Sequence, residues 1–104
     1  MPAVARAFGV DSVASPDGAG FNCASPTTTS TGPTANNRVF SDGLLVSHFG
    51  DIVAPHAITG CGTDSQSLDK VSTRVFVMGK GIGRLGDQYG DNVITSGSSR
   101  VFAG

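Results

Sequence analysis

The sequence lacks the features that mark helical, membrane-spanning and nucleic-acid-binding chains. No window keeps a helical spacing of apolar residues over three turns, because Gly, Pro, Ser or Thr interrupts every candidate. No apolar run is long enough to cross a bilayer, and no signal peptide is present. The net charge is −1, without the clusters of Lys and Arg that a nucleic-acid or membrane-surface partner requires. We therefore expect a chain that is made in a cytoplasm and leaves it only within an assembly.

Cysteine is also scarce, with only Cys23 and Cys61 present. Two cysteines allow one disulfide, but thiols of a protein made in the cytosol stay reduced. Cys and His at turn positions of such a protein are more often metal ligands. The sequence favours a metal, and leaves a disulfide or free thiols as alternatives.

Glycine, proline, serine and threonine dominate what is present. Fifteen Gly and five Pro in 104 residues indicate frequent turns, and Phe, Val and Ile supply the apolar content. We predict a single all-β domain, residues 1–104, built of short strands with few or no helices. The core of a chain of this size gives only marginal stability, so a stabilising cross-link such as a bound metal is of interest.

One segment occurs more than once. Arg74–Asp87 and Arg38–Asp51 have the same length, open with Arg-Val-Phe and end with Gly-Asp. The opening returns at Arg100–Phe102, and the ending has an early copy at Val4–Asp11. The chain therefore contains three copies of one hairpin unit, and the third is split between the two termini.

Each full copy predicts a hairpin followed by a sharp turn. Asp42-Gly43 is a hairpin turn signal in the first copy, and Gly79-Lys80-Gly81 is the expected turn of the second. Glycine permits a positive φ where the chain leaves the sheet, and Asp can accept hydrogen bonds from the backbone N–H groups that follow. These roles are expected of Gly50, Asp51, Gly86 and Asp87, in preference to catalysis. The regularly spaced arginines Arg74, Arg84 and Arg100 are expected to form ion pairs with such aspartates.

The intervening segments are polar. Ser12–Asn22, Gly62–Lys70 and Gln88–Asn92 are predicted to be loops. Ala24–Asn37 has the composition of a disordered linker. The similar order of residues in Thr95–Phe102 favours instead an extended segment that leads into the first hairpin.

These repeats resemble the PAAR-repeat proteins, the spike-tip proteins of contractile phage tails and of type VI secretion systems. The resemblance is carried by Val75–Lys80 running into Arg84–Asp87, by Val39-Phe40 with Gly50-Asp51, and by Ser96–Ser99 before Val101-Phe102. The namesake Pro-Ala-Ala-Arg reads Gly81-Ile82-Gly83-Arg84, and its Arg is kept in the second copy, whereas the first copy has Val46-Ser47-His48.

The resemblance implies a small cone of short strands with a pseudo-threefold base. The base of such proteins caps the blunt end of a trimeric β-helical spike, one tip per trimer, and the point helps to pierce the target cell envelope. It implies a location at a virion tail tip, assembled in a bacterial host cytoplasm, or at a type VI secretion spike that recruits effectors. Because the sequence ends directly after the last strand, without a fused toxin, the phage setting is favoured.

The resemblance also implies a structural zinc near the point. Its ligands would be Cys23, His56 and Cys61, from the loops between the repeats. The loop after the second Gly-Asp lacks the usual Cys, so Asp91 or His48 is the candidate for the fourth ligand. His48 lies at the Arg position of the first copy, and we expect it to face solvent or the spike.

A further alternative, less favoured than the secretion-system tip, is a small metal-dependent hydrolase, with Cys23, His56 and Cys61 on a metal that keeps an open position. No carboxylate base in a recognisable motif, Ser/His/Asp arrangement or phosphate-binding loop supports it. We therefore expect a structural protein rather than an enzyme.

Overall fold

The computed structural model describes residues 2–14, 28–54, 56–57, 63–64 and 66–104, which form only short strands, bridges and turns. The predicted all-β class is thus confirmed. The described residues include no helix that could span a membrane. The strands are β1 (Ser12–Ala14), β2 (Thr28–Ser30), β3 (Phe40–Ser41), β4 (Leu44–Leu45), β5 (His56–Ala57), β6 (Thr63–Asp64), β7 (Leu68–Lys70), β8 (Phe76–Val77), β9 (Lys80–Gly81), β10 (Gln88–Tyr89) and β11 (Asn92–Ile94).

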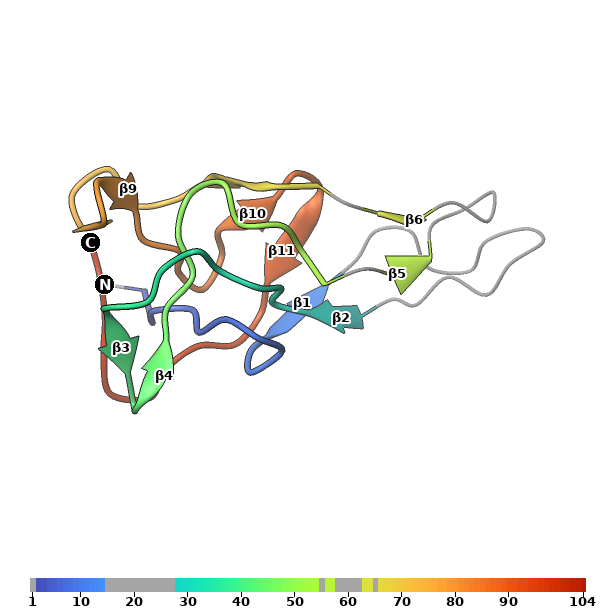
Figure 1. The fold of residues 1–104 in the computed structure, drawn as a ribbon. Coiled ribbons are helices and arrows are strands. Elements are labelled where there is room, and N and C mark those ends of the chain that lie inside the picture. Colours follow the sequence, from blue (N-terminus) through green and yellow to red (C-terminus); the bar gives the residue numbers. More distant parts are fainter. Residues whose placement is uncertain (1, 15–27, 55, 58–62, 65) are drawn as a thin grey trace.

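The molecule is elongated, with extents of 40 × 23 × 22 Å. The hairpins β3–β4 and β8–β9 lie at one end, together with both chain termini, and β5–β6 lies towards the other end (Figure 1). Between them is a five-stranded sheet in the order β2-β1-β11-β10-β7, antiparallel throughout. The two ends of the molecule therefore carry different elements.

The two predicted hairpins are present. Asp42-Gly43 connects β3 to β4 with φ of 57° and 78°, and Met78-Gly79 connects β8 to β9 with φ of 53° and 78°. Two positive φ angles define the tight turn that matches the twist of paired strands. The predicted turn at Gly79-Lys80-Gly81 was wrong by about one residue, since Lys80 and Gly81 already belong to the return strand.

The third copy is completed by the two ends of the chain. Phe102 bridges Ala3, as Phe40 pairs with Leu45 and Phe76 with Gly81 in the two full hairpins. The backbone N–H of Ala103 donates to Pro2 O at 2.9 Å. The split repeat inferred from the sequence is thus a hairpin in which the termini replace the turn.

A closed ring of backbone hydrogen bonds joins the three copies. The amide of Ala5 donates to Gly83 O (2.9 Å), that of Gly83 to Ser47 O (2.8 Å), and that of Ser47 to Ala5 O (3.0 Å). The flanking bridges Val4–Arg84, Ile82–His48 and Val46–Arg6 follow the same cyclic order. Residues from both ends and the middle of the sequence therefore occupy equivalent positions around a pseudo-threefold axis.

The ring separates two apolar clusters. The cluster nearer the hairpins contains the repeat-related residues Val4, Val46 and Ile82, with Val77 and Ala103. The cluster on the sheet side contains Ala5, Val13, Val53, Leu68, Tyr89 and Ile94. Gly83 is closely packed here, because an added Cβ would lie 2.9 Å from Cδ2 of the buried Leu68, which would have to shift. Small residues in the ring thus let larger side chains fill the interior.

Several segments predicted to be loops form strands. β1 lies within Ser12–Asn22, β6 and β7 lie within Gly62–Lys70, and Gln88–Asn92 holds β10 and the start of β11. Each strand has two or three residues, too few to show an alternating pattern. Within Ala24–Asn37, the described part includes β2, which pairs with β1. This pairing supports the extended lead-in rather than a linker.

The Gly-Asp turns have the predicted glycine geometry, with φ of 91° at Gly50 and 89° at Gly86. The predicted direction of aspartate capping was wrong. Asp51 Oδ2 accepts from the backbone N–H of His48 at 2.8 Å, three residues earlier, instead of from residues that follow. The aspartate thus closes the turn back onto the ring residue of its own copy.

Candidate functional site

The candidate site is the end of the molecule that carries the hairpins. We call it the base and define it by three Val-Phe pairs: Val39-Phe40, Val75-Phe76 and Val101-Phe102. Figure 1 shows that the two hairpins and both termini gather there.

A polar cap holds each pair in the same way. Asn36 Oδ1 accepts from the amides of Arg38 (3.0 Å) and Val39 (3.1 Å). Ser72 Oγ and Ser98 Oγ accept in the same manner from the amides two and three residues later, at 2.9–3.1 Å. The caps themselves are buried. The pattern Asn/Ser-x-Arg-Val-Phe is visible in the sequence, but its capping residue went unnoticed there.

The three pairs are exposed to nearly equal extents. Val39, Val75 and Val101 are 38%, 37% and 39% exposed, and Phe40, Phe76 and Phe102 are 57%, 59% and 48% exposed. Single exposed apolar residues are ordinary, but a repeated set at one end is a candidate interaction surface. The threefold order of the ring therefore continues onto the surface.

Further exposed apolar side chains come from the hairpins. Met78 forms part of the β8–β9 turn and is 53% exposed, and Leu44 in β4 is 38% exposed. No described element covers them. They extend the apolar character of the base.

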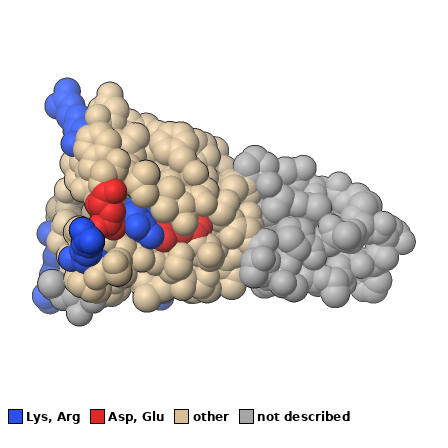
Figure 2. Space-filling view, turned by 90° about the horizontal axis from the view of Figure 1, so that it is seen from below, with Lys and Arg blue, Asp and Glu red and all other residues tan. Residues whose placement is uncertain are grey.

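Basic side chains accompany the base. Arg38, Arg74 and Arg100 directly precede the three Val-Phe pairs, and all three are exposed. Figure 2 shows Lys and Arg side chains at the hairpin end of the molecule. The site thus combines apolar side chains with positive charge.

Beneath the base, each copy pairs a cationic or imidazole side chain with an aspartate. Arg84 Nε donates to Asp87 Oδ2 at 2.8 Å, so the predicted pairing is confirmed for this arginine. Arg6 makes the equivalent pair with Asp11, its NH2 group donating to Oδ1 at 2.8 Å. Arg6 therefore occupies the motif position in the split copy, which the sequence analysis had assigned only to Arg84.

His48 is the third member of this set and was wrongly predicted to face solvent or the spike. It is 2% exposed. Its Nδ1 lies 2.8 Å from Phe49 O and 3.5 Å from Asp51 Oδ1. Its side chain is therefore buried, and its backbone forms a bridge to Ile82 of the second copy.

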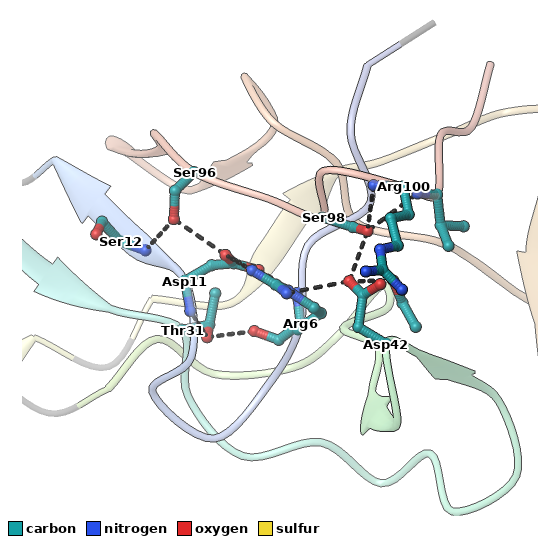
Figure 3. A network of polar contacts seen from close by, with 10 residues as sticks. Arg6, Asp11, Ser12, Thr31, Asp42, Ser96, Ser98 and Arg100 are labelled. Carbon is teal, nitrogen blue, oxygen red and sulfur yellow. Dashed lines mark hydrogen bonds and ion pairs between the residues drawn. The ribbon is translucent and has the colours of Figure 1, made fainter.

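Arg6 connects two aspartates in a polar network (Figure 3). Arg6 Nη1 donates to Asp42 Oδ2 at 3.1 Å, and Ser98 Oγ donates to the same oxygen at 2.6 Å. Burial by itself raises the pKa of Asp11, but hydrogen bonds from Arg6 and Ser96 and the charge of Arg6 outweigh it and lower the pKa below 3.8. The network ties the first hairpin to both terminal segments.

The other predicted ion pairs turn out differently. Arg100 lies close enough to Asp42 for its charge to contribute to a lowered pKa of that carboxyl, after the larger effect of the Ser98 hydrogen bond. Among the described residues, Arg74 forms no ion pair with an aspartate. The expectation for Arg74 was therefore wrong; this residue is exposed, and its backbone amide donates to Ser72 Oγ.

The metal candidates are only partly described. Cys23 and Cys61 lie outside the described residues, and for His56 the structure gives only its backbone, paired with Asp64 in β5–β6. Asp91 is exposed in the turn between β10 and β11. The described residues contain no group of three His, Cys, Asp or Glu side chains that could hold a metal. His48 is already engaged in the ring, which disfavours it as a ligand.

The aspartates and the one tyrosine are engaged structurally. Asp51 and Asp87 are buried in their turns. Burial raises the pKa of Tyr89 to about 12, so this side chain remains neutral and serves as core. An open hollow of about 360 Å³ lies beside Asp51, and its lining residues Pro33–Ala35 and Gly50–Ile52 include no other ionisable group.

Comparison with known proteins adds no assignment, because no family model matches the sequence and no curated protein matches it.

Proposed function

We propose that this chain is a structural tip protein that caps the end of a trimeric β-helical spike and sharpens it for piercing a cell envelope. The observation that carries the proposal is the base, where three Val-Phe pairs with matching caps have nearly equal exposure. One chain with three equivalent surfaces suits a partner with threefold symmetry. The resemblance to PAAR-repeat proteins names such a partner.

The physical need for a cap supports this partner. The open end of a β-helix presents unpaired backbone groups and apolar side chains. The base offers apolar side chains from short hairpins, and the ring keeps the three copies in register. The elongated body then extends away from the base. These features support the proposal of a cap that narrows the spike.

The proposed setting is the tail tip of a virion assembled in a bacterial host cytoplasm. A type VI secretion spike tip that recruits effectors is the second candidate, since the same base serves either system. The tip would contact the target cell envelope only transiently, and nucleic acid is not a proposed partner.

Docking is tested with the β-helical end fragment of the trimeric spike protein encoded nearest to this chain in its genome. We expect one tip per trimer. Phe40→Ala, Phe76→Ala and Phe102→Ala should each weaken binding by about tenfold or more. The three effects should be similar, because each phenyl side chain meets an equivalent surface of the trimer. Ile52→Ala, an exposed apolar residue outside the base, is the matched control and should leave affinity unchanged. Absence of binding, or dependence on one Phe alone, would contradict the proposal.

The structural zinc belongs to the same proposal, with Cys23, His56 and Cys61 as ligands. A closed Cys/His site would tie loops together where little core is present. We expect about one zinc per chain by mass spectrometry of protein purified without chelator. Cys61→Ser should lower zinc content and melting temperature together. Full zinc content with unchanged stability in that variant would count against the site.

A further inference from the structure

The three arginines before the Val-Phe pairs are held at equivalent positions. The amides of Arg38, Arg74 and Arg100 each donate to a buried cap oxygen, at 3.0, 3.1 and 3.0 Å. All three residues are exposed. The threefold order of the base therefore includes one positive charge beside each apolar pair.

These arginines differ from the two beneath the base. Arg6 and Arg84 each form a charge-assisted pair with a buried aspartate, at 2.8 Å. Arg38 and Arg74 pair with no carboxylate of the described residues. Arg100 lies near Asp42, but that carboxylate already accepts from Arg6 and Ser98. Among the described residues, two of the three positive charges thus have no carboxylate partner.

Docking would remove water from these guanidinium groups, because they adjoin the apolar side chains that a partner must cover. A guanidinium that loses water without gaining an acceptor costs free energy, whereas a facing carboxylate can bind it in two parallel hydrogen bonds. A symmetric partner would present the same acceptor three times.

We propose that the partner face carries three symmetry-equivalent acidic side chains around its apolar centre, and that Arg38, Arg74 and Arg100 pair with them. This inference rests on the proposed function and adds the chemical character of the partner face. We expect the contact of Arg100 to be the weakest, because its charge lies near the carboxylate of Asp42. Arg38 and Arg74 therefore contribute most to electrostatic docking.

The test measures binding to the same spike end fragment between about 50 mM and 500 mM NaCl, since surface charge pairs weaken as salt screens them. Wild-type affinity should fall as salt rises. Arg38→Gln and Arg74→Gln should each weaken binding about threefold to fivefold at low salt and flatten the salt dependence, whereas Arg100→Gln should have a smaller effect. Lys70→Gln removes an exposed charge from β7, outside the base, and is the control for net charge.

Asp42→Asn provides a test of opposite sign. Asparagine tolerates the positive φ of 57° and keeps an oxygen for Ser98, but removes a negative charge from the base. An acidic partner face predicts tighter binding by this variant at low salt. Circular dichroism and melting curves would establish that each variant is folded.

The outcomes separate this inference from the proposed function. Salt-independent binding that falls in Phe40→Ala but not in the arginine variants would overturn the acidic face and leave the apolar docking. Weaker binding by Asp42→Asn with an intact fold would also count against it. If wild-type protein binds vesicles containing anionic lipid and not the spike fragment, both proposals fail.

Discussion

At the scale of single residues, the most informative position is the one that holds Arg6, His48 and Arg84. Each side chain lies beside the aspartate that ends its own copy, and each residue bridges a neighbouring copy. The second copy could be predicted, because Arg84 and Asp87 are close in sequence. Arg6 was missed because Asp11 follows it by five residues instead of three, and the burial of His48 follows from ring pairing that no local pattern encodes.

Asp11 gives a prediction for pH dependence. Its pKa is lowered in the folded protein below its ordinary value of 3.8, so the folded state binds a proton less readily than the unfolded state. The stability from this carboxylate is present above about pH 4 and is lost as the pH falls through the lower folded pKa. Urea midpoints from pH 7 to 2.5 should fall at the acidic end, and more weakly in Asp11→Asn.

Direct titration of the Asp11 carboxyl by NMR supplies the check that does not depend on the variant folding. A midpoint at or above 3.8 in the folded protein would contradict the assignment.

At the scale of elements, the two hairpin turns have the same backbone but different residues. Asp42-Gly43 uses residues that suit positive φ, whereas Met78 adopts a φ of 53° without a side chain that favours it. Local strain at an exposed apolar residue of the base is consistent with a contact role for Met78, since Met adapts well to a partner surface.

We therefore predict that Met78→Asn stabilises the isolated protein by about 0.5–1 kcal/mol, because Asn occupies the left-handed region at lower cost. The same variant should bind the spike fragment more weakly. Thermal unfolding and binding measurements on one preparation give both values. Unchanged binding would show that Met78 makes no contact.

The elements also show where sequence reasoning stopped. The glycine-containing turn of β3–β4 and the repeated Arg-Val-Phe could be identified from the sequence, because each is recognised from a few consecutive residues. β1, β7 and β10 have two or three residues and are defined by partners far along the chain, such as Lys70 opposite Gln88. Such pairing leaves no local signal in the sequence, so composition alone indicated loops.

The split hairpin gives a further prediction. From Phe102 through Gly104, Met1 and Pro2 to Ala3 is six residues, the same number as from Phe40 to Leu45. A direct peptide bond between residues 104 and 1, with Met1→Gly, should therefore form the same two-residue turn. Closing the chain removes freedom from the unfolded state and should raise the free energy of unfolding by roughly 2–4 kcal/mol. Denaturant unfolding compares this cyclic chain with the linear Met1→Gly variant, and a less stable cyclic chain would contradict the turn.

At the scale of the whole molecule, the ring makes distant segments interdependent. Ala5, Ser47 and Gly83 each donate one hydrogen bond to another copy and accept one, so no copy can leave without breaking both neighbours' contacts. The sequence predicted three copies, but not this cyclic pairing, since it depends on backbone groups that every residue carries. The same closure gives the base its three equivalent Val-Phe pairs.

This interdependence predicts a common exchange behaviour for the three ring amides. If the ring opens only when the whole domain unfolds, the amide protons of Ala5, Ser47 and Gly83 should exchange with one free energy, equal to that of global unfolding. Hydrogen exchange followed by NMR, compared with denaturant unfolding under the same conditions, measures both. The exposed turn amides of Gly43 and Gly79 provide fast-exchanging controls.

An exchange rate for Ala5 more than about tenfold above that for Gly83 would mean that the terminal copy frays independently, because a tenfold difference corresponds to about 1.4 kcal/mol of local opening. The ring would then be an association of one stable pair with a detachable third copy, and the three parts of the base would no longer be expected to dock with equal strength.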